Sequence, residues 1–91
     1  MFRIILSCNG VPPSVASEAA LDIATEFTEH RPWHRNVSCR WTGSHLILQA
    51  ENDFDSEGLA LMDEFSDCLS VHIVELFDGT IKLESLTVLE S

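Results

Sequence analysis

The spacing of hydrophobic and polar positions changes several times along the chain, and each spacing predicts one type of element. Residues 2–8 are a mostly apolar run that is typical of a buried strand. Between residues 14 and 30 the apolar side chains instead recur every three or four positions, which predicts one buried face of a helix. The recurring positions are Ala16, Ala20, Ile23 and Phe27. Ser14 is expected to cap this helix, and Pro32 prevents its continuation.

The middle of the chain predicts a hairpin and a second helix. Residues 37–41 alternate between apolar and polar, residues 46–50 are mostly apolar, and Thr42-Gly43-Ser44 between them favours a turn. After a polar, acidic loop at 52–58, apolar side chains return at helical spacing. They are Leu61, Phe65 and Cys68, with Met62 and Leu69 beside them.

The end of the chain predicts a second hairpin. Apolar residues over 71–77 indicate a strand, Asp78-Gly79 is a strong signal for a two-residue turn, and 81–88 form the last strand. The alternation changes phase near Glu84–Ser85, which predicts a β-bulge there.

The resulting order, β-α-β-β-α-β-β, predicts one α+β domain over residues 1–91. Two helices would pack on one face of a mostly antiparallel sheet, in a ferredoxin-like arrangement with an extra C-terminal strand. This architecture carries many unrelated activities, so the function has to be sought in particular side chains.

The protein has a net charge of −10, and this charge is unevenly distributed along the chain. Residues 1–45 hold four arginines and four acidic residues, whereas residues 46–91 hold Lys82 and eleven acidic residues. Such a field repels nucleic acid and anionic membranes and attracts basic partners. The other interpretation is that the charge serves solubility alone.

Seven carboxylates within residues 51–67 form the candidate partner-binding site. They are Glu51, Asp53, Asp55, Glu57, Asp63, Glu64 and Asp67. Acids in the later turns of a helix oppose its dipole, so keeping them there favours a role in binding. We expect Asp63, Glu64 and Asp67 to be exposed. Trp33, within a short Arg-rich stretch, is a candidate anchor, since Trp and Arg dominate interface hot spots; the alternative is packing against the sheet.

No catalytic, cofactor or complete metal site is predicted. Asp53–Gly58 with Glu64 resembles the start of a calcium loop, but helical periodicity from residue 59 opposes it, and Asp53 and Asp55 are expected to cap the helix instead. The spacing of His30, His34, Cys39 and His45 does not suit zinc, and solvent-exposed histidines are expected.

The three cysteines, Cys8, Cys39 and Cys68, lack a paired pattern and favour a reduced, cytoplasmic protein. The N-terminus lacks the pattern of a signal peptide.

Some stretches are similar to immunity proteins of bacterial contact-dependent or polymorphic toxins. These stretches are Arg31-Pro32-Trp33, Cys39-Arg40-Trp41, Ala50–Asp55 and Leu61–Asp67, together with the small size and acidic balance. The resemblance implies a cytoplasmic protein that binds and blocks a toxin domain, often a basic nuclease, and that needs no cofactor. The alternative is a small regulatory or ligand-binding ferredoxin-like domain, which could also form an oligomer through its sheet.

Overall fold

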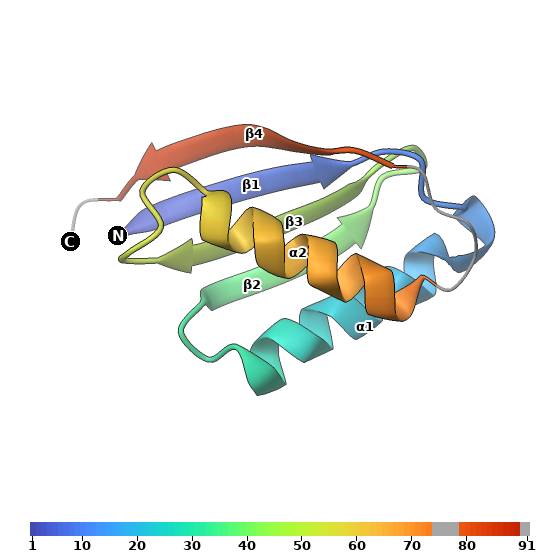
Figure 1. The fold of residues 1–91 in the computed structure, drawn as a ribbon, viewed down its shortest axis with the longest axis horizontal. Helices are drawn as coiled ribbons and strands as arrows, with labels where there is room; N and C mark the ends of the chain where they lie inside the picture. The colour runs from blue at the N-terminus through green and yellow to red at the C-terminus, as the bar shows by residue number, and fades with distance from the viewer. Residues whose placement is uncertain (74–78, 90–91) are drawn as a thin grey trace.

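The computed structural model describes residues 1–73 and 79–89, which form four strands and two helices (Figure 1). In chain order they are β1 (Phe2–Cys8), α1 (Pro13–His30), β2 (Arg35–Trp41), β3 (Leu46–Asn52), α2 (Leu59–His72) and β4 (Ile81–Val88). The changes of hydrophobic period before residue 71 therefore correspond to changes of element.

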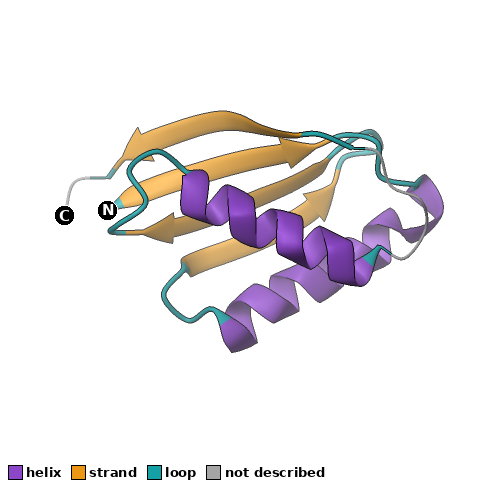
Figure 2. Ribbon diagram, in the orientation of Figure 1, coloured by secondary structure: helices purple, strands orange, loops and turns teal. Residues whose placement is uncertain are grey.

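The four strands form one sheet in the order β2-β3-β1-β4, and every neighbouring pair is antiparallel. Both helices lie on the same face of this sheet, side by side (Figure 2). The predicted α+β class and the ferredoxin-like arrangement are thus confirmed for the described residues. Their order is β-α-β-β-α-β, in which the strand at 81–88 takes the fourth place, so the described residues show no extra C-terminal strand.

The core lies between the sheet and the helices. Alternate residues of the central strands, such as Leu6 on β1 and Leu48 on β3, are fully buried and face the helix layer. Phe27 of α1 and Phe65 of α2 pack against them and are also fully buried.

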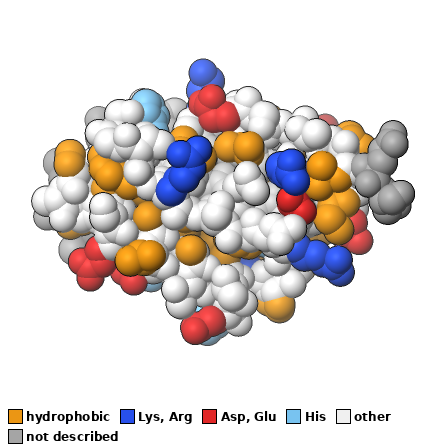
Figure 3. Space-filling view, turned by 180° about the vertical axis from the view of Figure 1, so that it is seen from behind, with side chains coloured by type: hydrophobic (Ala, Val, Ile, Leu, Met, Phe, Trp, Pro, Cys, Tyr) orange, Lys and Arg blue, Asp and Glu red, His pale blue; other side chains and the backbone are white. Residues whose placement is uncertain are grey.

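No helix in the described part of the chain covers the other face of the sheet, and we call it the open face. Because strand side chains alternate, it carries Arg3 and Ser7 from β1, Arg40 from β2, Glu51 from β3 and Lys82 from β4. Figure 3 shows this side of the molecule, where Lys and Arg side chains are spread over the surface.

The first helix begins earlier than predicted. Pro12 is the N-cap residue, Pro13 is the first helical residue, and no side chain caps the helix, so the prediction of Ser14 as N-cap is wrong. Proline suits the first helical position because its φ is already helical and its missing N–H would have no partner there.

The predicted strand over 71–77 also needs correction at its start. Val71 and His72 are the last residues of α2, and Ile73 follows as its C-cap. The rest of that strand and the start of the Asp78-Gly79 turn fall on residues 74–78, which lie outside the described residues.

The predicted bulge in β4 is confirmed. Leu83 lies opposite Leu6 and Ser85 opposite Ile5, so Glu84 is the extra residue.

Among the described residues, neither helix combines the length and apolar character that crossing a bilayer requires.

Candidate functional site

The outer surface of the two helices carries acidic side chains and no lysine or arginine. Neither α1 nor α2 contains a lysine or an arginine. Their seven acidic residues are Glu18, Asp22, Glu26, Glu29, Asp63, Glu64 and Asp67. Five of these are exposed, namely Glu18, Asp22, Glu29, Asp63 and Asp67, and we call these five residues the helix-face acids.

The basic residues lie elsewhere. Arg3, Arg40 and Lys82 lie on the open face, and Arg35 is exposed at the start of β2. Arg31, after the end of α1, pairs with Glu64. Charge is therefore distributed unequally between the two layers of the fold: the helices carry seven acidic residues without a lysine or arginine, whereas the sheet carries Glu51 and Glu84 together with four of the five basic residues.

The sequence analysis assigned the acidic surface to residues 46–91 alone, and the arrangement of the helices corrects this interpretation. Residues 1–45 are neutral when counted along the chain, but the acids of α1 lie on the helix layer while Arg3 and Arg40 lie on the opposite face. Glu18, Asp22 and Glu29 were therefore missed as candidate site residues. The absence of lysine and arginine from residues 14–30 was the sequence signal that could have identified them.

Glu51, one of the seven predicted carboxylates, does not belong to the helix layer. It lies on the open face and is only 5% exposed. Its carboxylate accepts hydrogen bonds from Arg3 Nε at 3.0 Å and from Asn36 Nδ2 at 2.9 Å. The bond from Asn36 and the bond and charge of Arg3 lower the pKa of Glu51 below its ordinary value. Its role in the structure is to hold β1 and the start of β2 to β3.

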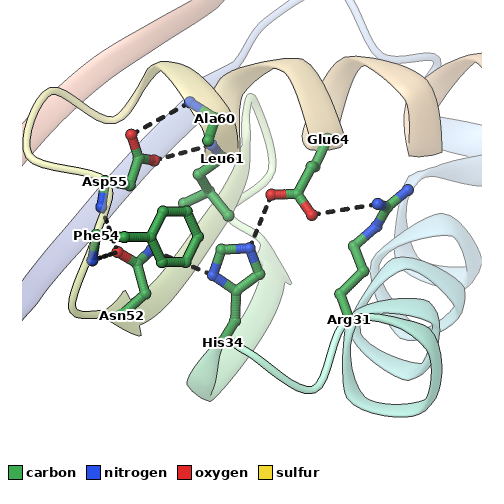
Figure 4. A network of polar contacts seen from close by, with 8 residues as sticks. All are labelled: Arg31, His34, Asn52, Phe54, Asp55, Ala60, Leu61 and Glu64. Carbon is green, nitrogen blue, oxygen red and sulfur yellow. Dashed lines mark hydrogen bonds and ion pairs between the residues drawn. The ribbon is translucent and has the colours of Figure 1, made fainter.

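Asp55 is also internal, since it is 6% exposed and caps α2 (Figure 4). Its carboxylate accepts hydrogen bonds from the backbone N–H groups of Ala60, at 3.2 Å, and Leu61, at 2.9 Å. These N–H groups have no partner within the helix, and the negative charge suits the positive end of the helix dipole. The prediction that Asp55 caps the helix is confirmed; Asp53 makes no such contact and is exposed.

The prediction that Glu64 is exposed is wrong. Its side chain is 14% exposed and binds two residues that precede β2 (Figure 4). Arg31 Nη1 lies 3.2 Å from Glu64 Oε2, and His34 Nε2 lies 2.9 Å from Glu64 Oε1. Glu64 therefore fixes α2 to the segment between α1 and β2.

His34 is correspondingly a buried histidine rather than a solvent-exposed one, with a side chain that is 0% exposed. Its Nδ1 lies 3.2 Å from Asn52 Nδ2. Asn52 Oδ1 accepts two backbone N–H bonds, from Phe54 and Asp55, so the amide orientation is fixed and Nδ2 donates to His34. His34 Nε2 then carries the proton that is donated to Glu64, and both ring nitrogens are used structurally.

The remaining predicted residues are at the surface. Asp53, Glu57, Asp63 and Asp67 are exposed, and Trp33 is 48% exposed. Trp33, Arg35 and Asp53 line one hollow of about 190 Å³. The structure thus brings Trp33 and Asp53 together, twenty residues apart in sequence, and leaves the Trp33 ring available to a partner.

Metal and thiol chemistry gain no support from the geometry. Within residues 1–73 and 79–89, no three His, Cys, Asp or Glu side chains gather as a metal site. Burial raises the pKa of the Cys8 thiol to about 11 and that of Cys39 to about 12, so both are protonated at neutral pH.

Comparisons with protein-family models, with curated proteins and with solved structures found no match for this chain.

Proposed function

We propose that this protein binds a basic protein partner through the outer surface of its helix layer. The observation that carries the proposal is the distribution of charge: α1 and α2 have seven acidic residues and no lysine or arginine, and the exposed arginines and Lys82 lie on the sheet. A surface of one sign accelerates encounter with a surface of the opposite sign and orients the approaching partner.

The resemblance to immunity proteins suggests the class of partner. A nuclease toxin domain must attract phosphates and therefore has a positively charged cleft. An acidic helix layer that covers such a cleft blocks access of the nucleic acid, and this inhibition needs no catalytic group on the inhibitor. The protein would act in the cytoplasm, where the toxin reaches its substrate.

The oligomeric form of the alternative, a small regulatory or ligand-binding domain that associates through its sheet, has less support. A homo-oligomer of that kind would need an apolar, uncharged open face. The face carries Arg3, Arg40, Glu51 and Lys82 instead.

Two variants with the same net charge test whether the position of the charge matters. In the first, three helix-face acids are neutralised: Asp22→Asn, Asp63→Asn and Asp67→Asn. In the matched control, three positive charges are added to the open face: Ser38→Lys, Gln49→Lys and Thr87→Lys. Each variant gains three charge units, but only the first alters the proposed surface.

The variants are immobilised and compared with the wild type for retention of basic proteins from an extract of the native cell. We expect the wild type and the control to retain a basic protein that the helix-face variant loses. With that partner purified, the association rate of the helix-face variant should fall tenfold or more at 0.01 M salt, where the Debye length is about 30 Å. If both variants lose the partner equally, only net charge matters and the proposed surface is wrong.

Two further measurements address the anchor and the class of partner. Trp33→Ala should raise the dissociation rate while leaving the association rate nearly unchanged, because hot-spot contacts act mainly on dissociation. If the partner is a toxin, cells that express it should survive with the wild type and die with the helix-face variant. Survival with both would contradict inhibition through the helix-face acids.

A further inference from the structure

A second candidate site lies on the opposite side of the molecule. A hollow of about 390 Å³ opens where the end of β1, the loop before β3 and the start of β4 meet. Its polar lining residues are Ser7, Asn9, His45, Thr80, Lys82 and Glu84. None of them belongs to the helix layer, so this hollow is independent of the proposed partner-binding surface.

The β-bulge in β4 builds the charged part of this hollow. Glu84 is the extra residue of the bulge, and Lys82 lies opposite Ser7 on the open face. Bulges redirect side chains, and this one brings the Glu84 carboxylate to Ser7. Ser7 Oγ donates a hydrogen bond to Glu84 Oε1 at 2.7 Å, and Ser7 is only 5% exposed. The carboxylate is therefore held in place by a buried hydroxyl.

The two opposite charges in the hollow do not neutralise each other by direct contact. Lys82 and Glu84 are both exposed, and no ion pair joins them. One Glu84 oxygen accepts from Ser7, which leaves the other for a ligand. The hollow thus has a separate cation and a separate anion.

Asn9 and His45, which also line the hollow, each make one side-chain hydrogen bond within the protein and keep another polar atom for a ligand. Asn9 Oδ1 accepts the backbone N–H of Thr80 at 2.7 Å, so the Asn9 NH₂ group is left as a donor. His45 Nδ1 bonds the Ser44 hydroxyl at 2.8 Å, so its Nε2 is left for a ligand. These contacts fix the orientation of both side chains before a ligand arrives, which lowers the entropy cost of binding.

We propose that this hollow binds the head group of a free α-amino acid. The ammonium group would bind the Glu84 carboxylate, and the carboxylate would bind Lys82 and the Asn9 amide. A simple anion is repelled by Glu84 and a simple cation by Lys82, whereas a zwitterion uses both charges. The volume lies within the range of small-molecule sites and leaves room for a side chain.

Titration of the ¹⁵N-labelled protein with each of the twenty standard amino acids tests the proposal. At least one should shift the backbone amide signals of Ser7, Asn9 and Lys82 with a dissociation constant below about 10 mM. The best ligand is then compared with its amide, which lacks the carboxylate, and with its 2-hydroxy acid, which lacks the ammonium. Both analogues should bind at least tenfold more weakly.

Variants give an independent test. Lys82→Met and Glu84→Gln should each weaken binding at least tenfold, whereas Arg40→Met, a control that removes a cation from the same face outside the hollow, should leave it unchanged. No saturable shift with any amino acid, or equal binding of the 2-hydroxy acid, would overturn the proposal. The analogue comparison uses the wild-type protein, so it decides the question even if a variant fails to fold. Loss of the basic partner in the earlier experiment would have no bearing on these results.

Discussion

Removing the carboxylate of Glu64 should destabilise the fold far more than removing any of the helix-face acids. Glu64→Ala deletes the acceptor for both His34 Nε2 and Arg31 Nη1. Asp63→Ala is the matched control, because it removes one negative charge from the adjacent position of the same helix, where the side chain is exposed.

The expected magnitude follows from the two contacts. A hydrogen bond to a charged group contributes about 1.5–3 kcal/mol, and breaking a buried ion pair by removing one partner costs about 3–5 kcal/mol. The side chains of Glu64 and Arg31 are 14% and 23% exposed, so the pair is only partly buried and we take the low end, about 3 kcal/mol. Glu64→Gln should cost about half as much, since its amide oxygen can still accept from His34. Asp63→Ala should change the free energy of unfolding by less than about 0.5 kcal/mol.

Urea denaturation followed by the fluorescence of Trp33 and Trp41 measures these differences. With an m-value of about 1.5 kcal/mol/M, a loss of 3 kcal/mol lowers the midpoint by about 2 M. The order of midpoints should be wild type, then Glu64→Gln, then Glu64→Ala, with Asp63→Ala beside the wild type. Equal midpoints for Glu64→Ala and Asp63→Ala would refute the assignment of Glu64 to an internal network.

Three further predictions concern other internal groups. Asp55→Ala should cost about 1–2 kcal/mol of unfolding free energy because α2 loses its cap, whereas Asp53→Ala should be near neutral in the same urea assay. Glu51→Gln should cost about 1.5–3 kcal/mol at pH 7. Because the folded-state pKa of Glu51 is lowered, its contribution is present above its ordinary value of 4.5 and is lost as the pH falls, so wild type and variant should converge in acid; a constant gap would contradict this. Cys8 and Cys39 should resist iodoacetamide at pH 8 until the protein unfolds, since burial raises both pKa values; rapid labelling of the native protein, read by mass, would show otherwise.

The sequence was sufficient to predict elements whose signal is local. The recurrence of Ala16, Ile23 and Phe27 identified the buried face of α1, and the change of phase near Glu84 located the bulge. Asp55 was expected to cap α2 because it precedes a helical pattern by a few residues, and its two bonds to backbone N–H groups confirm this. Such features depend on neighbours along the chain.

The position of each carboxylate was harder to predict because it depends on residues far away in sequence. Glu64 became internal through Arg31 and His34, 33 and 30 residues away, and Glu51 through Arg3, 48 residues away. Periodicity placed Glu64 opposite the apolar stripe of its helix, but it could not show that another segment covers that position. The extent of the acidic surface was likewise hidden, because it joins side chains from two helices that are distant in the sequence.

The two register shifts in the sheet bear on the behaviour of the protein at high concentration. Among the described strands β2 and β4 are the outer ones, and the backbone groups at such an edge offer a template for another chain, which is how edge-to-edge aggregation begins. The pairing of β2 shifts between Arg35 and Ser38, where Asn36 has a φ of +50°, and the pairing of β4 shifts at Glu84. A strand from a second molecule could match only part of either interrupted edge, and β2 also presents two arginines. The same bulge that places Glu84 beside Ser7 therefore also protects the sheet from growing into a fibril.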